Sequence, residues 1–159
     1  MISHEAGTVG LLTDSERYID LLHQAYSLYF TQGKEAAYKI FRRFMSTGYE
    51  DAEIPLPRLG GAAESDDERF LKYELLQFLY FPDLRLLREN GTSVAVAWGK
   101  GSGEEIFYVR ATVLQVQFLG CERYMLPGNH TGFRYEPEAF AGGVLKIFGD
   151  LEEKNKNKS

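Results

Sequence analysis

The sequence predicts a single α+β domain in which three N-terminal helices pack on a curved antiparallel sheet of about 4–6 strands. Helix-capping patterns and helical periodicity dominate residues 13–81, whereas apolar residues alternate along much of 92–126. The length of 159 residues and the hydrophobic content of 44% suit one domain with its own core. We expect this domain to span 13–150, between a flexible N-terminus at 1–12 and a charged flexible tail at 151–159.

The first predicted helix covers about residues 14–31. Thr13 and Glu16 have the spacing of a capping box, in which a hydroxyl and a carboxylate satisfy backbone N–H groups, and Gly33 suits a helix end. The apolar side chains of this helix cover roughly 200° of its surface. Because one contact needs a narrower arc, we expect other parts of the structure to cover two sides of this helix.

Two further helices are predicted in the N-terminal half. One covers about residues 34–46 and has a narrow apolar stripe. The other begins at a second capping box, covers about 65–81 and ends before Pro82. It is apolar almost all round, which is typical of a helix in the middle of a fold. Residues 49–64, which contain prolines and glycines, are predicted to form a loop with room for one short edge strand.

The hydrophobic period changes after Pro82. Residues 84–89 and 92–98 have the form of a β-hairpin, because the intervening Asn90-Gly91 tolerates the positive φ values of a tight turn. The alternative is one more helical turn at 84–90, with Gly91 as its cap.

A long strand is predicted at residues 106–119. Its apolar side switches near 112–114, which indicates a bend or a bulge and hence a strongly curved sheet. A further strand is expected at 121–126, ended by Pro127-Gly128-Asn129. Residues 137–149 suit either a helix or a strand, because a Glu-Pro start favours a helix and the Gly-Gly pair weakens it.

The order of these elements, three helices followed by long antiparallel strands, resembles that of the ketosteroid-isomerase-like cone, or cystatin-like α+β, superfamily. The resemblance covers about residues 14–126 and rests on element order and on the apolar third helix, without a motif. It implies a helical part packed in the concavity of a curved sheet. It implies no residue roles, since the superfamily includes enzymes, small-molecule binders and association domains.

Charge and composition exclude several classes of function. The net charge is −5, and residues 1–80 carry all of it, with 8 Lys/Arg against 13 Asp/Glu. Without a long basic stripe, we expect no nucleic-acid partner. The longest apolar run, 75–81, is too short to cross a membrane, and no membrane partner is expected. The lone Cys121 excludes an internal disulfide and favours a cytoplasmic location, while three scattered histidines predict no metal and no cofactor.

The third helix carries one candidate site. Phe70, Glu74, Gln77 and Phe81 recur at i, i+4, i+7 and i+11, which places a carboxylate and an amide in an aromatic row. If this row faces a cavity, burial would raise the pKa of Glu74 and suit it to acid–base chemistry. The alternative is that Glu74 and Gln77 mark the solvent edge of the helix.

The second candidate site is the polar loop at 129–136. His130 would be a proton carrier, Arg134 an anion clamp and Glu136 an orienting carboxylate. The stiff flanking segments fit a surface loop, and loops carry function more often than their share. No nucleophile is tied to this loop by spacing, and the sequence lacks a nucleophile-elbow motif.

Two functions follow from these features. The first is a non-enzymatic interaction module that binds a protein partner, or itself as a homo-oligomer, through the aromatic surface of the first or third helix, with Tyr29 among its contacts. The alternative is a pocket for a small apolar molecule, with Glu74 as acid or base. His23, Tyr73 and Tyr80 are weaker candidates for that chemistry.

Overall fold

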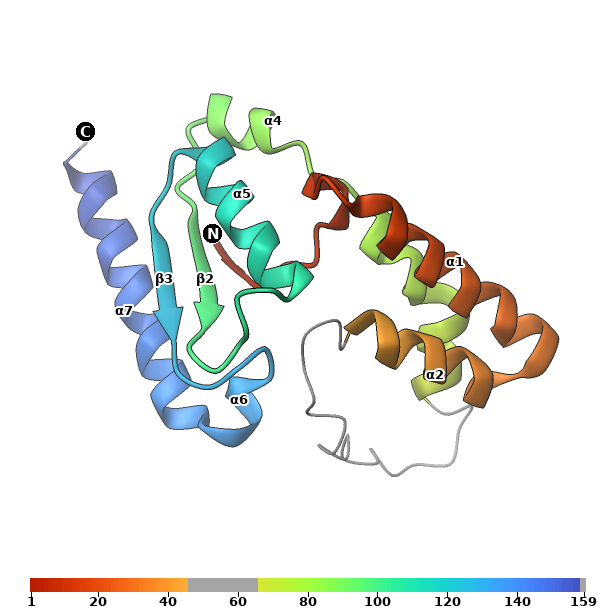
Figure 1. The fold of residues 1–159 in the computed structure, drawn as a ribbon. Helices are drawn as coiled ribbons and strands as arrows, with labels where there is room; N and C mark the ends of the chain where they lie inside the picture. Colours follow the sequence, from red (N-terminus) through yellow and green to blue (C-terminus); the bar gives the residue numbers. More distant parts are fainter. Residues whose placement is uncertain (46–65, 158–159) are drawn as a thin grey trace. The chain divides into compact units, whose positions relative to one another are not determined.

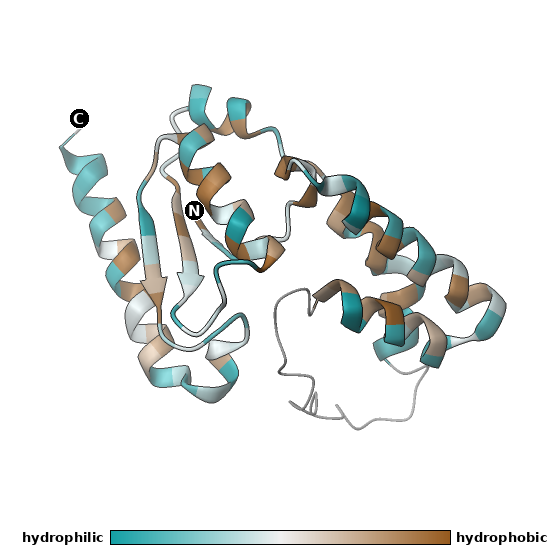
Figure 2. Ribbon diagram, in the orientation of Figure 1, coloured by the Kyte–Doolittle hydropathy of each residue, from teal (hydrophilic) through white to brown (hydrophobic). Residues whose placement is uncertain are grey.

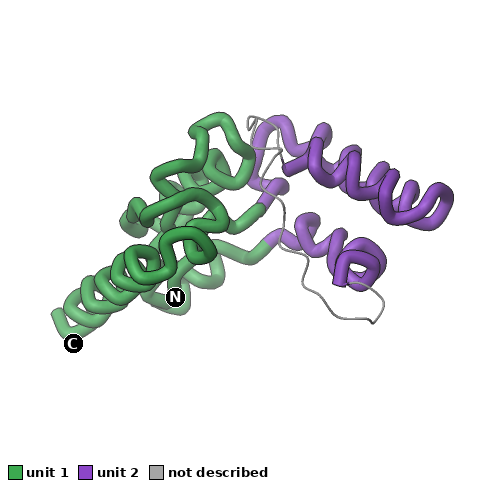
Figure 3. The backbone as a smooth tube through the Cα atoms, turned by 90° about the horizontal axis from the view of Figure 1, so that it is seen from below, with its two compact units in different colours: residues 1–7, 82–159 green, residues 8–81 purple. Residues whose placement is uncertain are grey.

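The computed structural model describes residues 1–45 and 66–157 and contains two compact units. The first, which we call the sheet unit, comprises residues 1–7 and 82–159 (Figure 3). The second, the helical unit, comprises residues 8–81. Each unit has its own set of buried side chains.

The sheet unit is built on three parallel strands in the order β1-β2-β3 (Figure 1). Ser3 is paired with Val96, and Ala97 is paired with Tyr124. The central strand therefore comes from the middle of the chain, and one of its neighbours comes from the extreme N-terminus. The strands are β1 (Ile2–His4), β2 (Ala95–Gly99) and β3 (Arg123–Leu126).

Helices cover both faces of this sheet. Ala95 and Ala97 of β2 belong to a buried cluster with Ile147 and Leu151 of the long C-terminal helix α7 (Pro137–Lys156). Because side chains alternate along a strand, the fully buried Val96 points to the opposite face, towards the helix that connects β2 to β3. The other helices of this unit are α4 (Leu84–Glu89), α5 (Phe107–Leu119) and α6 (Gly132–Tyr135).

The helical unit contains η1 (Val9–Leu11), α1 (Ser15–Gln32), α2 (Lys34–Met45), α3 (Asp66–Arg69), η2 (Phe70–Glu74) and η3 (Leu75–Leu79). Gly33 joins α1 to α2 with a φ of 90°, a value that favours glycine. Hydrophobic and hydrophilic residues both occur along α1 and α2 (Figure 2). The hydrophobic residues that are fully buried in this unit include Tyr18, Leu22, Ala25, Ala37, Phe44, Leu71 and Leu75.

Phenylalanine rings from two parts of the helical unit pack against one another. The centroid of Phe41 lies 5.0 Å from that of Phe70, and Phe44 lies 5.2 Å from Phe78. Such pairs contribute about 0.5–1.5 kcal/mol each beyond the area that they bury. Aromatic residues make up 14% of the sequence, and part of them is therefore packed inside this unit.

The first two predicted helices are confirmed by α1 and α2. The third predicted helix is helical from Asp66 to Leu79, although its winding changes from α to π at Phe70 and to 3-10 at Leu75. Tyr80 is extended, as expected close before Pro82. The loop predicted at 49–64 lies outside the described residues.

The predicted curved antiparallel sheet of 4–6 strands is wrong, because the described residues form a three-stranded parallel sheet. The error lies chiefly in residues 106–119, which form α5 and not a long strand. Val109, Thr112 and Val113 favour strands locally. Adjacent residues such as Phe107 and Tyr108 are nevertheless both buried, which fits one face of a helix and not the alternation of a half-buried strand. Packing of that face against β2 outweighs local propensity.

The hairpin predicted at 84–98 is also wrong, and the alternative helical turn is correct. The Asp83 carboxylate accepts a hydrogen bond from the N–H of Leu86 at 2.9 Å, which caps the start of α4. Gly91 has a φ of 66° just beyond its end. The strand expected at 121–126 is confirmed by β3, and residues 137–149 are helical in α7.

Both ends of the chain carry regular structure where we expected flexibility. The predicted flexible N-terminus includes β1 and η1. The predicted tail includes the last turns of α7, where Lys154 Nζ lies 2.7 Å from a carboxylate oxygen of Glu122.

Candidate active site

Three segments of the sheet unit meet at the carboxyl edge of its parallel strands. Glu5 directly follows β1, Gly99 ends β2, and His130 lies in the loop that follows β3. Ligands of open parallel sheets bind at this edge, outside the carboxyl ends of the strands. The fold therefore brings these three positions to the place where such sheets carry their function.

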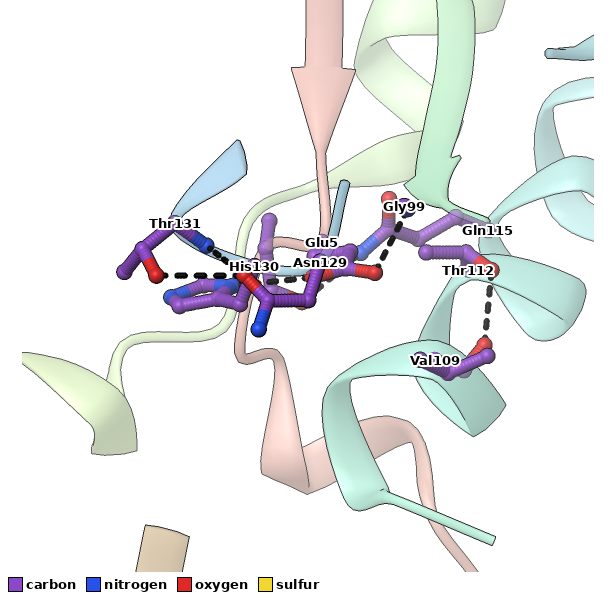
Figure 4. A network of polar contacts seen from close by, with 9 residues as sticks. Glu5, Gly99, Val109, Thr112, Gln115, Asn129, His130 and Thr131 are labelled. Atoms are coloured by element: carbon purple, nitrogen blue, oxygen red, sulfur yellow. Dashed lines mark hydrogen bonds and ion pairs between the residues drawn. The ribbon is translucent and has the colours of Figure 1, made fainter. Parts of the chain in front are cut away.

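Glu5 is the centre of this cluster. Its side chain has no exposed surface, and its carboxylate accepts a hydrogen bond from the N–H of Gly99 at 2.7 Å (Figure 4). Its φ is 43°, in the left-handed region that residues with a side chain seldom adopt. Backbone strain of this kind is found mainly where the surrounding structure fixes a functional residue.

Hydrogen bonds keep Glu5 ionised in spite of its burial. Burial raises the pKa of the carboxyl, but the hydrogen bonds of His130 and of the N–H of Gly99 act in the opposite direction, and the pKa ends below its ordinary value. A buried carboxylate is thus available as a negatively charged acceptor.

His130 is the group that this carboxylate orients. Its Nδ1 lies 3.0 Å from a carboxylate oxygen of Glu5. An ionised carboxylate can only accept, so Nδ1 carries a proton in this contact. In the neutral ring the second nitrogen, Nε2, then has a free lone pair. Because 39% of the His130 side chain is exposed, the imidazole is accessible to a reactant.

The loop that carries His130 is held in place by hydrogen bonds. The side-chain oxygen of Asn129 accepts from the N–H of Thr131 at 3.0 Å and from its hydroxyl at 3.1 Å. The N–H of Gly101 donates to the carbonyl of Gly128 at 2.7 Å. The loop is therefore anchored both internally and to the segment after β2.

The absence of a side chain at Gly99 allows the loop to approach β2. A Cβ atom at this position would lie 2.7 Å from the backbone of Asn129, closer than real Cβ contacts permit. The segment after β1 is fixed from another side by Gln115 of α5, whose amide donates to the carbonyl of Ala6 at 3.3 Å. Gln115 also accepts from the hydroxyl of Ser3 at 3.0 Å.

Two aromatic rings pack against the imidazole of His130. The centroid of the Tyr108 ring, at the start of α5, lies 4.5 Å away. The ring of His4 lies 6.1 Å away and nearly parallel, and His4 in turn contacts Phe140 of α7. The imidazole is thus held at its Nδ1 by Glu5 and on its ring surface by neighbouring rings.

A cavity of about 290 Å³ lies at the opposite, amino edge of the sheet. Its charged lining groups are Arg88, Glu122 and Lys154. Lys154 is paired with Glu122, and Arg88 donates to the carbonyl of Phe118 at 3.3 Å. Cys121 also lines it, and burial raises the pKa of its thiol. These charges are engaged by the protein itself, so the cavity is a weaker candidate than the carboxyl edge.

The aromatic row predicted on the third helix does not form one site. The Glu74 side chain is 43% exposed and lies 3.2 Å from Arg69, so it lacks the burial that an acid–base role requires. Phe70 packs against Phe41, whereas Gln77 and Phe81 are exposed. Glu74 and Gln77 therefore mark a solvent-facing edge.

Other candidate residues are also dispersed. His23 is exposed on α1, and the half-buried Tyr29 contacts the adjacent Phe30. Tyr73 and Tyr80 are exposed. Arg134 is exposed and lies over the ring of Phe133.

His130 is the predicted residue that the structure places in a built site. The carboxylate that contacts it is Glu5 and not Glu136, and sequence reasoning missed both Glu5 and His4. The two partners are 125 residues apart, so no local spacing could join them. The signal available in the sequence was the polar pair His4-Glu5. It would have indicated a site only if residues 2–4 had been recognised as a strand.

No protein-family model, no curated protein and no solved structure matches this chain. The resemblance to the ketosteroid-isomerase-like superfamily therefore stays a prediction, without the antiparallel sheet that it implies. Residues 1–45 and 66–157 contain no group of three or more His, Cys, Asp or Glu side chains placed to hold a metal. Within the same ranges, no helix has the length and apolar character of a transmembrane span.

Proposed function

We propose that this protein is an enzyme that uses His130 as a general base and acid, with Glu5 as the carboxylate that orients it. The reaction class is hydrolysis or acyl transfer. The observation that carries the proposal is the 3.0 Å contact between a fully buried carboxylate and Nδ1 of an accessible imidazole. The other ring nitrogen can then accept a proton.

The proposed reaction uses the two ring nitrogens differently. Nε2 of His130 takes a proton from the hydroxyl of water, or of another nucleophile, as its oxygen attacks an acyl carbon. The resulting imidazolium is stabilised by Glu5, which stays ionised. The same Nε2 proton then passes to the leaving group, which restores the neutral ring.

The order of the two residues along the chain is a further, weaker support. In serine enzymes of the α/β-hydrolase fold, the acid also precedes the histidine in the sequence. This is an analogy of arrangement, and the G-x-S-x-G motif of those enzymes does not occur in these 159 residues.

Hydrolysis of p-nitrophenyl acetate, a reporter ester, tests the proposal. We expect Glu5→Gln, which keeps the shape and an acceptor, and His130→Gln each to lower kcat/KM by about 10²–10⁴. His23→Gln is the matched control, since His23 is exposed on another unit. If both site variants fold and hydrolyse the ester within twofold of the wild-type rate, the proposal is wrong.

A second candidate function is protein association through the helical unit. It is favoured by exposed rings on that unit: Tyr73 is 69% exposed and Tyr80 72%. Large exposed aromatic side chains are typical of interfaces. We expect the mass in sedimentation to rise with protein concentration and Tyr73→Ser plus Tyr80→Ser to abolish the rise. Tyr135→Ser, which changes an exposed ring of the sheet unit, is the control; a mass independent of concentration contradicts this function.

A further inference from the structure

A second imidazole lies directly beside the proposed catalytic pair. His4 is the last residue of β1, and its ring centroid is 6.1 Å from that of His130 with 16° between the ring planes. The ring of Phe140 contacts His4 edge-on, at 5.2 Å and 80°. The backbone of His4 is paired with Ala97 in the sheet. Strand pairing and two ring contacts thus fix the position of this imidazole.

The surroundings of His4 disfavour a positive charge on it. Its Nε2 is buried and makes no hydrogen bond to any described residue. Burial lowers the pKa of His4; Glu5, next in the chain, acts in the opposite direction, and His130 lowers it further. From α7, the group that faces His4 is the uncharged Phe140 ring. His4 is therefore neutral at neutral pH.

We propose that His4 is a positioning residue for His130, a flat uncharged ring that packs against the imidazole so that Nδ1 stays on Glu5 and Nε2 stays open to a reactant. The inference rests on the proposed function of the Glu5–His130 pair. It adds a requirement that the pair alone does not have: residue 4 must supply a ring, and that ring must carry no charge.

The absence of charge matters because Glu5 lies beside both imidazoles. When His130 takes a proton during the reaction, its charge is balanced by the Glu5 carboxylate. A cation at residue 4 would compete for the same carboxylate and repel the imidazolium. Phenylalanine at residue 4 should therefore preserve the arrangement, whereas alanine removes the ring and lysine introduces the charge.

Long-range ¹H–¹⁵N NMR of the imidazole rings tests this inference without requiring activity. The chain has three histidines, and the exposed His23 serves as an internal reference. In wild-type protein and in His4→Phe we expect His130 mainly as the tautomer with the proton on Nδ1. In His4→Ala and His4→Lys we expect the fraction with the proton on Nε2 at least to double. An unchanged tautomer ratio in folded His4→Ala overturns the inference.

A reciprocal measurement covers the case in which substitution of His4 unfolds β1. In His130→Asn, which leaves residue 4 intact, the pKa of His4 should rise, because a protonated imidazole at residue 130 no longer lies 6.1 Å from its ring. An unchanged pKa contradicts the coupling. Glu5→Gln separates the two proposals. The proposed function fails if wild-type His130 shows no preference for the tautomer with the proton on Nδ1, or if that preference persists in Glu5→Gln. This outcome does not depend on which residue stands at position 4.

Discussion

The two edges of the same parallel sheet use their polar residues in different ways. At the carboxyl edge, a fully buried Glu5 carboxylate collects the N–H of Gly99 and the imidazole of His130. At the amino edge, Lys154 and Glu122 form an ion pair in which both side chains are largely exposed, 42% and 61%. The first arrangement desolvates a charge and gives it directed partners, whereas the second is a surface pair.

The difference follows from the geometry of a parallel sheet with helices on its faces. At the amino edge the helices end, and their last carbonyls attract cations: Arg88 donates to the carbonyl of Phe118 in the last turn of α5. The charged side chains at the amino edge are therefore paired with each other or with backbone carbonyls. At the carboxyl edge the strands end in loops that carry Glu5 and His130, and their polar groups converge on one another. Convergence and burial, and not the number of charges or the size of a cavity, distinguish the proposed site at the carboxyl edge from the amino edge.

The largest expected effect comes from a substitution that prevents the His130 loop from packing closely against β2. Gly99→Ala places a Cβ atom 2.7 Å from the backbone of Asn129, so the loop must move. We expect the free energy of unfolding to fall by roughly 1–3 kcal/mol and ester hydrolysis to fall with it. Urea unfolding measures the first quantity.

Gly142→Ala is the matched control for this change. Gly142 lies within α7, and a Cβ there meets nothing within 4 Å. Alanine favours helices over glycine, so stability should rise by about 0.5–1 kcal/mol. If Gly99→Ala is as stable as wild type, the close approach of loop and strand is not what holds His130.

The pH dependence of stability distinguishes a buried carboxylate from an exposed one. The pKa of Glu5 is lowered below its ordinary value of 4.5, so its ionised form stabilises the fold above that value. This contribution is lost as the pH falls through the lowered pKa. We therefore expect the stability difference between wild type and Glu5→Gln to shrink as the pH falls from about 5 to 3. A difference that stays constant over this range would contradict the ionised state of Glu5.

A smaller effect is expected from the hydrogen bonds inside the His130 loop. Asn129→Ala removes the acceptor for both the N–H and the hydroxyl of Thr131. We expect a loss of about 1 kcal/mol in the free energy of unfolding, together with faster amide hydrogen exchange at Thr131. Asn129→Asp keeps the acceptor and should restore both values. The loop does not depend on this turn if exchange is unchanged in the alanine variant.

The smallest effect is expected at the amino edge. Lys154→Ala breaks an exposed ion pair, and such pairs contribute about 0–1 kcal/mol. We expect a change in unfolding free energy below about 0.5 kcal/mol that disappears in high salt, and no change in ester hydrolysis. Lys156→Ala is the control on the same helix. A loss of activity in Lys154→Ala alone would move the functional site to this edge.

The sequence predicted the parts of this protein that local patterns determine. Helical periodicity identified α1 and α2, although α1 begins after Asp14, which makes no side-chain capping hydrogen bond, and not at a Thr13 capping box. The density of polar residues between two prolines identified the His130 loop. Local pattern failed at α5, where β-branched and apolar residues fit both periods and the surrounding structure decides. It also failed at Glu5, because the N-terminal residues pair with β2, more than ninety positions away.

The central claim is that Glu5 and His130 act as a coupled pair, and a double-mutant cycle in unfolding free energy tests it most directly. Glu5→Gln, His130→Gln and the double variant are compared with wild type at neutral pH. A hydrogen bond to a buried charge predicts a coupling energy of about 1.5–3 kcal/mol. Single effects that add to within about 0.5 kcal/mol would show that the two side chains do not depend on each other, and would contradict the account.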